Sequence, residues 1–534
     1  MTMASLRDFV ADTPAGTDPA QAAAQATVLD ALSAAFTPVP EAGTTTHRLT
    51  WLDTFDWRLY RAGLMLRFEH ARRGGGRLLL NRTDGTPQAE QPVTTWPRRP
   101  RLAEDLPDGP VRDRIIALTS PRALLPIARA ITTVGVTRLL NPDGKTVARL
   151  VTDHTTVTAP GITAPTAELP ARLAVTGVRG YPGQARKAAA LVAAVPGLGY
   201  ASQTVFTAAL TALGRHPSTG GSASSTEPEI TAAMPAPVAV ARLLLRLLDT
   251  LELNVDGVLR DIDTEFLHDL RVAVRRTRSA LKLLGGVLPA DLTGHYAAEF
   301  KWLGDLTTPT RDLDVHLLGF DAMASQLADA GPADLEPLRA FLVRRRAREF
   351  RKLARALRGP RFRAITDDWR KELLEIRDAG GPPRPTAAGL AWATTGRSFR
   401  RIATQGGAIT AASPPESLHN LRKRAKELRY LLEFFAPLHD PVAYRKVVSD
   451  LKQLQDCLGA FQDSEVQRAE IHDLADAMLA ERAAPAATLL AMGEIAAKLA
   501  LSQAEARAEF AARFARFAGP AGRERVRVLL EGRP

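Results

Sequence analysis

Two stripes of residues share the stretch from Leu267 to Leu284. Apolar side chains recur there at spacings of three and four, the period of an α-helix with one buried face. They are Leu267, Leu270, Val274, Leu281 and Leu284. Basic side chains form a second stripe on the neighbouring face, with no acid among them. They are His268, Arg271, Arg275, Arg278 and Lys282. Because like charges on a helix repel by roughly 0.2–0.5 kcal/mol per pair, the stripe favours an anionic ligand.

The same pattern returns 151 residues later, between Leu418 and Phe435. His419, Arg422, Lys426 and Arg429 stand at the matching positions, and Glu433 replaces Lys282. The register continues downstream into a second set of equivalent residues. Leu303, Asp305, Asp312, Asp314 and Val315 match Leu454, Asp456, Asp463, Glu465 and Val466. This long agreement indicates an internal duplication and two similar helical halves.

Helical spacing continues through most of residues 234–534, an all-α domain. Breaks are expected at Gly285-Gly286, Pro309, Gly331-Pro332, Gly359-Pro360, Gly380 to Pro385, Gly406-Gly407, Pro414-Pro415 and Pro437 to Pro441. They predict roughly eight to ten helices, in two bundles of about four helices related by a pseudo-two-fold axis.

Two further helices of this domain are expected to carry cation stripes. Residues 341–358 place five arginines at helical spacing, and the partner segment holds three more. They are Arg344, Arg348, Arg351, Arg355 and Arg358, and then Arg397, Arg400 and Arg401.

Before residue 214 the pattern changes to short β-like runs. They are HRLTWLDT, MLRFEHA, RLLLNRT, VGVTRLL, TVARLVTDHTTVT and ARLAVTGVRG. Asn141 to Gly144 predicts a hairpin from Thr137 to Thr152. Helices are expected at Ala20–Phe36, Val111–Leu118 and Pro182–Val195. Residues 1–213 therefore predict an α+β domain with an antiparallel sheet or barrel, and the Gly/Ser/Thr/Pro-rich residues 214–233 predict a flexible linker.

Composition refines this picture. The chain has 534 residues, a formal net charge of +12 and an estimated pI of 10.1, so anionic partners are favoured. Cys457 is the single cysteine, which excludes an intrachain disulfide and fits a reducing cytoplasm. No signal peptide or membrane-spanning run is evident, so a soluble cytoplasmic protein is expected. The preference for alanine and arginine over isoleucine and lysine is typical of GC-rich bacterial genomes.

The duplicated LHxLR segments, each followed by a segment similar to Arg311-Asp312-Leu313-Asp314-Val315, resemble the CHAD domain, the conserved-histidine α-helical domain. The resemblance covers about Pro235 to Phe517 and implies two helical bundles with a basic cavity that binds inorganic polyphosphate. It implies a lining of His268, Arg271, Arg275, Arg278 and Lys282 with His419, Arg422, Lys426 and Arg429. The arginines at 344, 348, 351, 355, 397 and 400 are added as further polyphosphate-binding residues. Glu433 implies that one end of the second stripe does not touch phosphate.

The first domain resembles the CYTH or triphosphate-tunnel fold through Leu52-Asp53-Thr54-Phe55-Asp56-Trp57-Arg58-Leu59, Gly63 to Arg67, and Val178 to Tyr181. That family's opening strand carries E-x-E-x-K, whose glutamates hold a divalent metal. Residues 1–50 contain Glu41 as their one glutamate, and no such pattern. Since tunnel hydrolysis needs a metal, a degenerate barrel is expected. Arg58, Arg67, Arg82 and Arg138 are its expected anion-binding residues.

These patterns lead to a non-catalytic polyphosphate-binding protein with no cofactor or metal, located in the cytoplasm, for example at polyphosphate granules, and able to meet polyphosphate-metabolising enzymes. Asp312, Asp314 and Asp463 are expected to orient arginines or cap helices. The alternatives are a Mg²⁺- or Mn²⁺-dependent triphosphatase in the first domain and non-specific nucleic-acid binding. Aromatic residues make up 6% of the chain and none interleaves the first stripe, which argues against single-strand binding.

Overall fold

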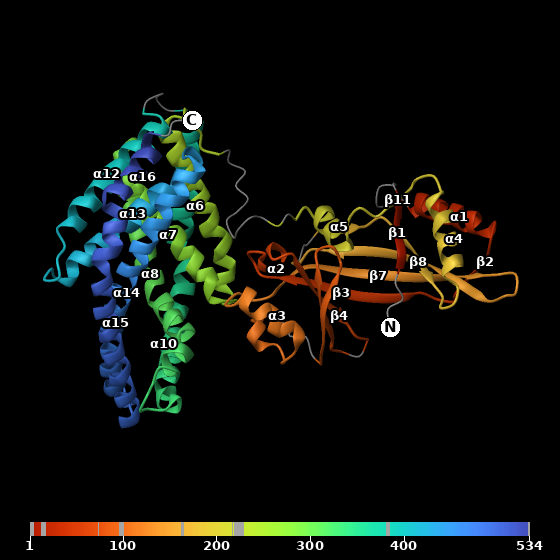
Figure 1. The fold of residues 1–534 in the computed structure, drawn as a ribbon, viewed down its shortest axis with the longest axis horizontal. Helices are drawn as coiled ribbons and strands as arrows, with labels where there is room; N and C mark the ends of the chain where they lie inside the picture. Colours follow the sequence, from red (N-terminus) through yellow and green to blue (C-terminus); the bar gives the residue numbers. More distant parts are fainter. Residues whose placement is uncertain are drawn as a thin grey trace. The chain divides into compact units, whose positions relative to one another are not determined.

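The structure is a computed structural model that describes residues 5–11, 18–72, 74–94, 101–161, 165–215, 217, 229–380 and 385–531. It divides into two compact units, Met1–Gly221 and Ser222–Pro534, and the division falls within the segment expected as a linker. Residue 216 and residues 218–228 of that segment lie outside the described residues. The first unit combines a sheet with helices and the second is all α-helical, which confirms the predicted fold classes (Figure 1).

The first unit is built on one antiparallel sheet, with eleven strands among the described residues. Its strands are β1 (Ser5–Ala11), β2 (Thr37–Pro40), β3 (Thr45–Asp53), β4 (Leu64–His70), β5 (Gly76–Arg82), β6 (Pro87–Val93), β7 (Leu125–Leu140), β8 (Thr146–Thr158), β9 (Thr166–Glu168), β10 (Arg172–Gly177) and β11 (Leu198–Tyr200). The spatial order is β11-β1-β10-β8-β7-β3-β4-β5-β6, with β2 beside β7 and β9 beside β8. The first and last strands of this order, β11 and β6, are not paired with each other, so the described strands make an open sheet.

The expected hairpin is confirmed, and it is longer than predicted because β7 begins at Leu125 and β8 ends at Thr158. Its turn is fixed by Asn141, whose side-chain oxygen accepts from the backbone nitrogen of Lys145 at 2.9 Å. Gly144 has φ +73°, a left-handed conformation that glycine adopts without a steric penalty.

Helices supply the apolar cover of this sheet. They are α1 (Asp18–Ser33), α2 (Arg58–Arg61), η1 (Ala103–Asp105), α3 (Pro110–Thr119), α4 (Pro182–Ala193) and α5 (Val205–Ala212). Helix α3 packs on β4, β5 and β6, and α1 with α4 packs on β1, β8 and β10. Helix α5 packs near β3 and β7. The three predicted helices are found, although α1 ends earlier than expected and is followed by β2. Strand β1 and helix α5 carry too weak a pattern for the prediction to include them.

The second unit consists of α6 (Ala236–Leu259), α7 (Thr264–Leu284), η2 (Gly285–Val287), α8 (Ala290–Leu318), α9 (Phe320–Ala324), η3 (Pro332–Leu335), α10 (Glu336–Leu357), α11 (Pro360–Asp378), α12 (Ala387–Gly407), α13 (Pro415–Phe434), η4 (Ala436–Leu438), α14 (Pro441–Ala480), α15 (Ala486–Ala518) and α16 (Pro520–Glu531). Helices α14 and α15 form a long antiparallel pair, and α8 pairs with α10 (Figure 1).

The backbone repeats the register seen in the sequence. Helices α6, α7 and α8 and the short η2 begin 151 residues before α12, α13, α14 and η4, respectively. Each described half holds five long helices rather than about four, because α11 packs on α6 and α16 packs on α14. The two repeats contact each other through α7 and α13, through α6 and α12, and through an apolar cluster that α8, α10, α14 and α15 share.

One expected helix break is wrong. Pro309 lies inside α8, which continues from Ala290 to Leu318. An interior proline costs roughly 3 kcal/mol because it removes a backbone donor and crowds the preceding turn. Buried Leu303, Thr307, Thr310 and Leu313 on either side of it anchor both parts of α8 in the bundle. The other expected breaks within the described residues coincide with helix ends, whereas the turns after α14 and α15 were not predicted.

Helices α6 and α7 approach closely at Gly257, where an added Cβ would overlap the phenyl ring of the buried Phe266. We predict that Gly257→Ala lowers the free energy of unfolding by about 1 kcal/mol or more, because overpacking costs roughly 1–3 kcal/mol and exceeds the gain in helix propensity. Urea unfolding measures this difference. Gly493→Ala in α15 is the control, since its Cβ would meet nothing within 4 Å, and it should raise stability by about 0.5–1 kcal/mol. Equal effects of the two substitutions would contradict the close approach.

Candidate functional site

Helix α7 forms because its ends and its apolar face are both satisfied. The Oδ1 atom of Asp263 caps it by accepting from the backbone nitrogens of Glu265 at 3.0 Å and Phe266 at 3.3 Å. The predicted apolar stripe is buried in full. Its equivalents on α13 are also buried: Leu418, Leu421, Ala425, Leu432 and Phe435. The burial of one face fixes the direction in which the neighbouring basic residues point.

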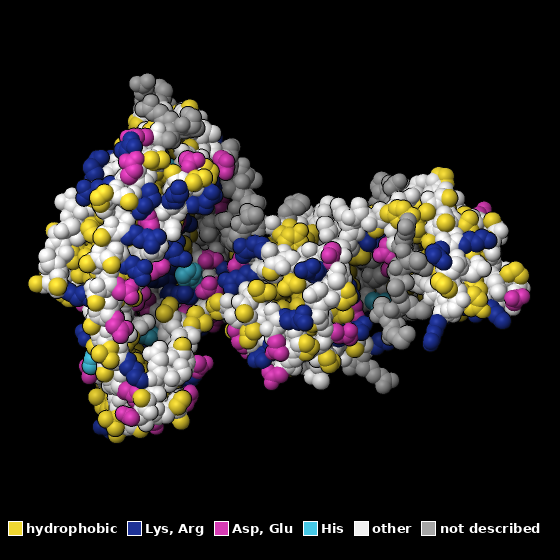
Figure 2. All heavy atoms as spheres, in the orientation of Figure 1, with side chains coloured by type: hydrophobic (Ala, Val, Ile, Leu, Met, Phe, Trp, Pro, Cys, Tyr) yellow, Lys and Arg dark blue, Asp and Glu magenta, His cyan; other side chains and the backbone are white. Residues whose placement is uncertain are grey.

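A cavity of about 710 Å³ lies between α7, α13 and α14. Helix α7 contributes His268, Val272, Arg275 and Arg276. Helix α13 contributes Arg422, Lys426, Arg429, Tyr430 and Glu433. Helix α14 contributes Gln455, Asp456, Gly459, Ala460 and Asp463. In the space-filling view, Lys and Arg side chains gather on the helical unit (Figure 2). The lining holds five Lys or Arg side chains and three carboxylates, so its formal charge favours anions.

Two of the three carboxylates in the lining form ion pairs with arginines. Asp463 accepts from Nη2 of Arg422 at 2.7 Å. Glu433 accepts from Nε of Arg429 at 2.7 Å and also pairs with Arg276. Three of the five Lys and Arg side chains are thereby partly neutralised.

Arg275 and Lys426 remain without a carboxylate partner. Within the part of the chain that the structure describes, neither forms an ion pair, and the guanidinium of Arg275 lies 6.0 Å from the ring centre of Tyr430. The two residues are 151 positions apart and therefore equivalent in the two repeats. The duplication thus brings one uncompensated cation from each half to the same cavity.

The surroundings of Lys426 lower its pKa to about 8. Burial is the largest cause, because it penalises the charged amine, and the guanidinium groups of Arg422 and Arg275 add repulsion. The pKa of His268 is also lowered, first by burial and then by Arg311. The neutral imidazole is therefore favoured at His268.

The structure brings together part of the predicted set. Five of its members line the cavity: His268, Arg275, Arg422, Lys426 and Arg429. His419 is not among the lining residues, and its Nδ1 lies 2.5 Å from Oε1 of Gln462. The α10 and α12 arginines are exposed and are not among the lining residues. They are Arg344, Arg348, Arg351, Arg355, Arg397 and Arg400.

The remaining basic residues of the α7 stripe also lie outside the cavity lining. Arg271 donates to the hydroxyl of Thr308 on α8 at 2.7 Å. Arg278 is exposed, and Lys282 forms an ion pair with Glu427 at 2.6 Å. One face of α7 is thus divided between α8, solvent and the cavity, which a helical wheel does not reveal.

The expected ion pairing of the carboxylates is confirmed for Asp314 and Asp463. Buried Asp314 accepts from Nε of Arg346 at 2.6 Å, and Asp261 holds the other two guanidinium nitrogens at 2.7 and 2.8 Å. Asp312 forms no ion pair among the described residues. Burial lowers the pKa of Arg271, and the charge of Asp312 acts against that shift. Sequence reasoning missed Arg346 because it lies between the stripe positions of α10.

The α7–α13 contact between the two repeats is charge-swapped: two positions that are basic on α7 are acidic on α13. Arg276 and Lys282 on α7 are equivalent to Glu427 and Glu433 on α13. Arg276 pairs with Glu433 and Lys282 pairs with Glu427, so the first position of each repeat meets the second position of the other. This crossing pattern requires the two helices to run antiparallel about a pseudo-two-fold axis. Glu433 therefore joins the halves, which explains its departure from the basic stripe.

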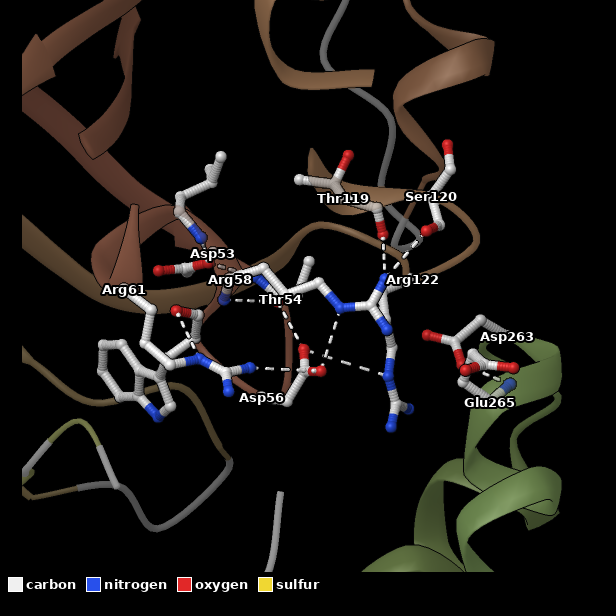
Figure 3. A network of polar contacts seen from close by, with 12 residues as sticks. Asp53, Thr54, Asp56, Arg58, Arg61, Thr119, Ser120, Arg122, Asp263 and Glu265 are labelled. Carbon is white, nitrogen blue, oxygen red and sulfur yellow. Dashed lines mark hydrogen bonds and ion pairs between the residues drawn. The ribbon is translucent and has the colours of Figure 1, made fainter. Parts of the chain in front are cut away.

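In the first unit, charged side chains of the tunnel-like motif form hydrogen bonds with neighbouring residues (Figure 3). Arg58 donates to Oδ2 of Asp56 at 2.9 Å and to the carbonyl oxygens of Thr119 at 3.0 Å and Ser120 at 2.8 Å. These donors tie α2 to the end of α3, and the expected role of Arg58 in anion binding stays a prediction. Arg67 pairs with Glu69 at 3.2 Å, whereas the roles of Arg82 and Arg138 stay predictions.

The first aspartate of the tunnel-like motif is a buried cap. Asp53 accepts from the backbone nitrogens of Thr54 at 2.7 Å, Leu59 at 2.9 Å and Tyr60 at 2.9 Å. Burial raises its pKa to about 6, although the three backbone donors act against that shift. Across the described ranges, no group of three or more His, Cys, Asp or Glu side chains is placed to hold a metal ion.

Comparisons with known proteins identify a known domain family in the helical unit. Residues 242–472 match the CHAD domain. A solved CHAD domain from the plant Ricinus communis is 24% identical with a TM-score of 0.41, and the alignment covers 58% of this chain and 98% of that one. PptA from Streptomyces chartreusis is 18% identical with a TM-score of 0.42, covering 52% and 99%. No curated protein matches the chain.

A third solved structure belongs to a protein described as an adenylyl cyclase with a dominant triphosphatase activity, HpAC1 from Hippeastrum. It is 13% identical with a TM-score of 0.25, and the alignment covers 39% of this chain and 95% of that one.

The charge-swapped contact predicts an energetic coupling between Arg276 and Glu433. In a double-mutant cycle with alanine, we expect a coupling of about 1 kcal/mol, because the pair is half-buried at the junction of the two repeats. Urea unfolding of the two single variants and the double variant measures it. The exposed pair Lys301–Asp305 within α8 is the control and should couple by roughly 0.3–0.5 kcal/mol. A coupling near zero at Arg276 and Glu433 would remove the pair from the forces that join the repeats.

Proposed function

We propose that this protein, which carries a CHAD domain at residues 242–472, binds inorganic polyphosphate in the cavity between α7, α13 and α14. The observation that carries the proposal is the pair of equivalent, uncompensated cations, Arg275 and Lys426, in a lining with three further arginines. A polyanion supplies the charge that this lining lacks. Guanidinium groups suit it well, because they donate two parallel hydrogen bonds to phosphate oxygens.

The ligand must compete with the carboxylates already present. Arg422, Arg429 and Arg276 are held by Asp463 and Glu433 in the free protein. These pairs keep the guanidinium groups oriented, and a polyphosphate chain can share or replace the carboxylate contacts. Arg275 and Lys426 need no such exchange, so they are proposed as the first contacts with the polymer.

Nucleic acid fits this lining less well than bare phosphate. Single-strand binders offer aromatic faces on which bases stack. Among the described lining residues Tyr430 is the one aromatic, and its side chain is 8% exposed and adjoins Arg275 and Phe434. Competition between polyphosphate and single-stranded DNA at physiological salt separates the two ligands, and preferential binding of DNA would contradict the proposal.

The proposed biological role is to bring this chain to polyphosphate, or to hold the polymer for polyphosphate-metabolising enzymes. No described helix is long and apolar enough to cross a membrane.

A second candidate function is triphosphate hydrolysis in the first unit, suggested by the tunnel-like motif. In the motif, Asp53 caps α2 and Arg58 links α2 to the end of α3. These structural roles favour a non-catalytic first unit. Phosphate release from tripolyphosphate with Mg²⁺ or Mn²⁺ decides the question. We expect turnover no higher than that of a blank, and clear metal-dependent release would establish an enzyme.

Substitutions in the cavity should weaken binding selectively. We predict that Arg275→Ala combined with Arg422→Ala lowers polyphosphate affinity by ten-fold or more, since hydrogen bonds to charged groups contribute about 1.5–3 kcal/mol each. Calorimetry at several salt concentrations measures the affinity, and its salt slope should fall as cations are removed. Lys423→Ala is the matched control, because Lys423 is exposed on α13 and does not line the cavity.

The same measurement on Arg348→Ala with Arg351→Ala tests the exposed α10 stripe. A loss as large as that of the cavity variant would assign the stripe to the same binding site. Unchanged affinity of the cavity variant, with native unfolding behaviour, would refute the proposed site.

Binding should depend on pH through Lys426. Its amine is charged below its pKa of about 8 and loses the charge above it, so affinity should fall as pH rises through 8. An ordinary lysine would keep its charge to about pH 10. Calorimetry from pH 6.5 to 9.5 measures the decline. Lys426→Arg should flatten the profile, because arginine stays protonated throughout, and an equal decline in that variant would exclude Lys426 as its source.

A further inference from the structure

The α7–α13–α14 cavity also holds a reactive amine in a setting built for phosphate. Lys426 is half-buried on the cavity wall, and in the described structure no carboxylate lies within ion-pair distance of its ammonium group. We propose that Lys426 is a covalent modification site that acyl phosphates acylate in preference to the other lysines. The proposal shares the cationic cavity with the proposed function, but its chemistry does not require polyphosphate to be the ligand.

The arginines around Lys426 can bind the phosphate group of such a reagent while the amine attacks its carbonyl carbon. On α13 it is flanked by Arg422 and Arg429, and α7 presents Arg275 from the opposite wall. Guanidinium groups bind the phosphate end of an acyl phosphate and leave its carbonyl carbon beside the amine. The remaining charged or titratable residues of the lining are His268 and Arg276 on α7, Glu433 on α13, and Asp456 and Asp463 on α14.

Two of the three carboxylates of this lining are paired with arginines. Glu433 is paired with Arg276 and Arg429, and Asp463 is paired with Arg422. An ammonium group without a carboxylate partner is easier to deprotonate, and burial beside Arg422 and Arg275 lowers the pKa of Lys426 further, to about 8. A much larger fraction of Lys426 than of an ordinary lysine is therefore the neutral nucleophile at pH 7.4.

The reaction balances without any further reagent. The lone pair of Nζ attacks the carbonyl carbon, a nitrogen–carbon bond forms, and the carbon–oxygen bond to the phosphate breaks. Inorganic phosphate leaves and takes up the proton that the amine loses, so an acyl phosphate and a lysine give an amide and hydrogen phosphate. Nothing is oxidised or reduced. The product lacks the positive charge of Lys426, so acylation should weaken polyanion binding in the same cavity.

Lys423 provides an internal control on the same helix, because it is exposed and does not line the cavity. At pH 7.4 the neutral fraction at Lys426 exceeds that of an ordinary lysine by on the order of 100-fold. Lower basicity also lowers nucleophilicity, with a Brønsted slope of about 0.4–0.5 in thiol chemistry. Taken together, these effects of the amine alone predict acetylation about ten-fold faster at Lys426 than at Lys423, and binding of the phosphate group adds to that preference.

The experiment treats the full-length wild-type protein with acetyl phosphate and follows each lysine-containing peptide by mass spectrometry over time. We expect a preference for Lys426 above the ten-fold that the amine alone provides, and we expect excess tripolyphosphate to slow acetylation at Lys426 while leaving Lys423 unchanged. Equal or slower acetylation at Lys426 would overturn the proposal. N-acetoxysuccinimide, a neutral acylating reagent, should show a smaller preference because it has no phosphate to bind, and an undiminished preference would overturn the phosphate-guided part.

A second readout separates this proposal from polyphosphate binding. Polyphosphate affinity is measured by calorimetry before and after acetyl phosphate treatment, for the wild-type protein and for Lys426→Arg. Treatment should lower the affinity of the wild-type protein and leave that of Lys426→Arg at its own untreated value, and an equal loss in both would contradict the assignment to Lys426. If polyphosphate does not bind at all, selective acetylation of Lys426 still supports the modification site while the proposed function fails.

Discussion

The helical unit depends on the antiparallel contact between α7 and α13. Both helices bury one apolar face in their own bundle, and the adjacent basic faces must then meet each other. Two columns of cations would repel if they faced each other directly. The chain resolves this conflict by placing Glu427 and Glu433 on α13 where α7 has Arg276 and Lys282. The cations of the crossing are thus compensated, whereas their neighbours Arg275 and Lys426 remain available for a ligand.

This arrangement explains why the cavity is unequal on its two sides. Its lining comes mainly from α13 and α14, and α7 closes it from the other repeat. On α14, Gly459 occupies the position equivalent to Thr308 on α8. The hydroxyl of Thr308 binds Arg271 in the first repeat, whereas Gly459 offers no side chain to Arg422, which extends to Asp463 instead. The first repeat therefore uses its arginine to hold α7 on α8, and the second repeat exposes its arginine to the cavity.

In the first unit, Asp53 and Arg58 of the tunnel-like motif have structural roles. Its acidic and basic side chains close a network around α2, in which each Asp53 oxygen accepts backbone hydrogen bonds and Arg58 reaches the end of α3 (Figure 3). Burial makes Asp53 harder to ionise, and the backbone donors offset only part of that cost. These contacts account for the aspartate and arginine of the motif without any ligand.

The sequence by itself determined the elements whose period is strong. Helices α7 and α13, their shared register of 151, strand β8 and the turn at Asn141 follow from spacing and local hydrogen bonding, which act within a few residues. The continuation of α8 through Pro309, the ion pair of Arg346 with Asp314, and the selection of cavity residues from the basic stripes did not follow. They depend on contacts between residues far apart in the chain. A helical stripe shows which side chains share a face, but only the packing of α7 against α8, α13 and α14 decides which of them meets a threonine, a carboxylate, solvent or the cavity.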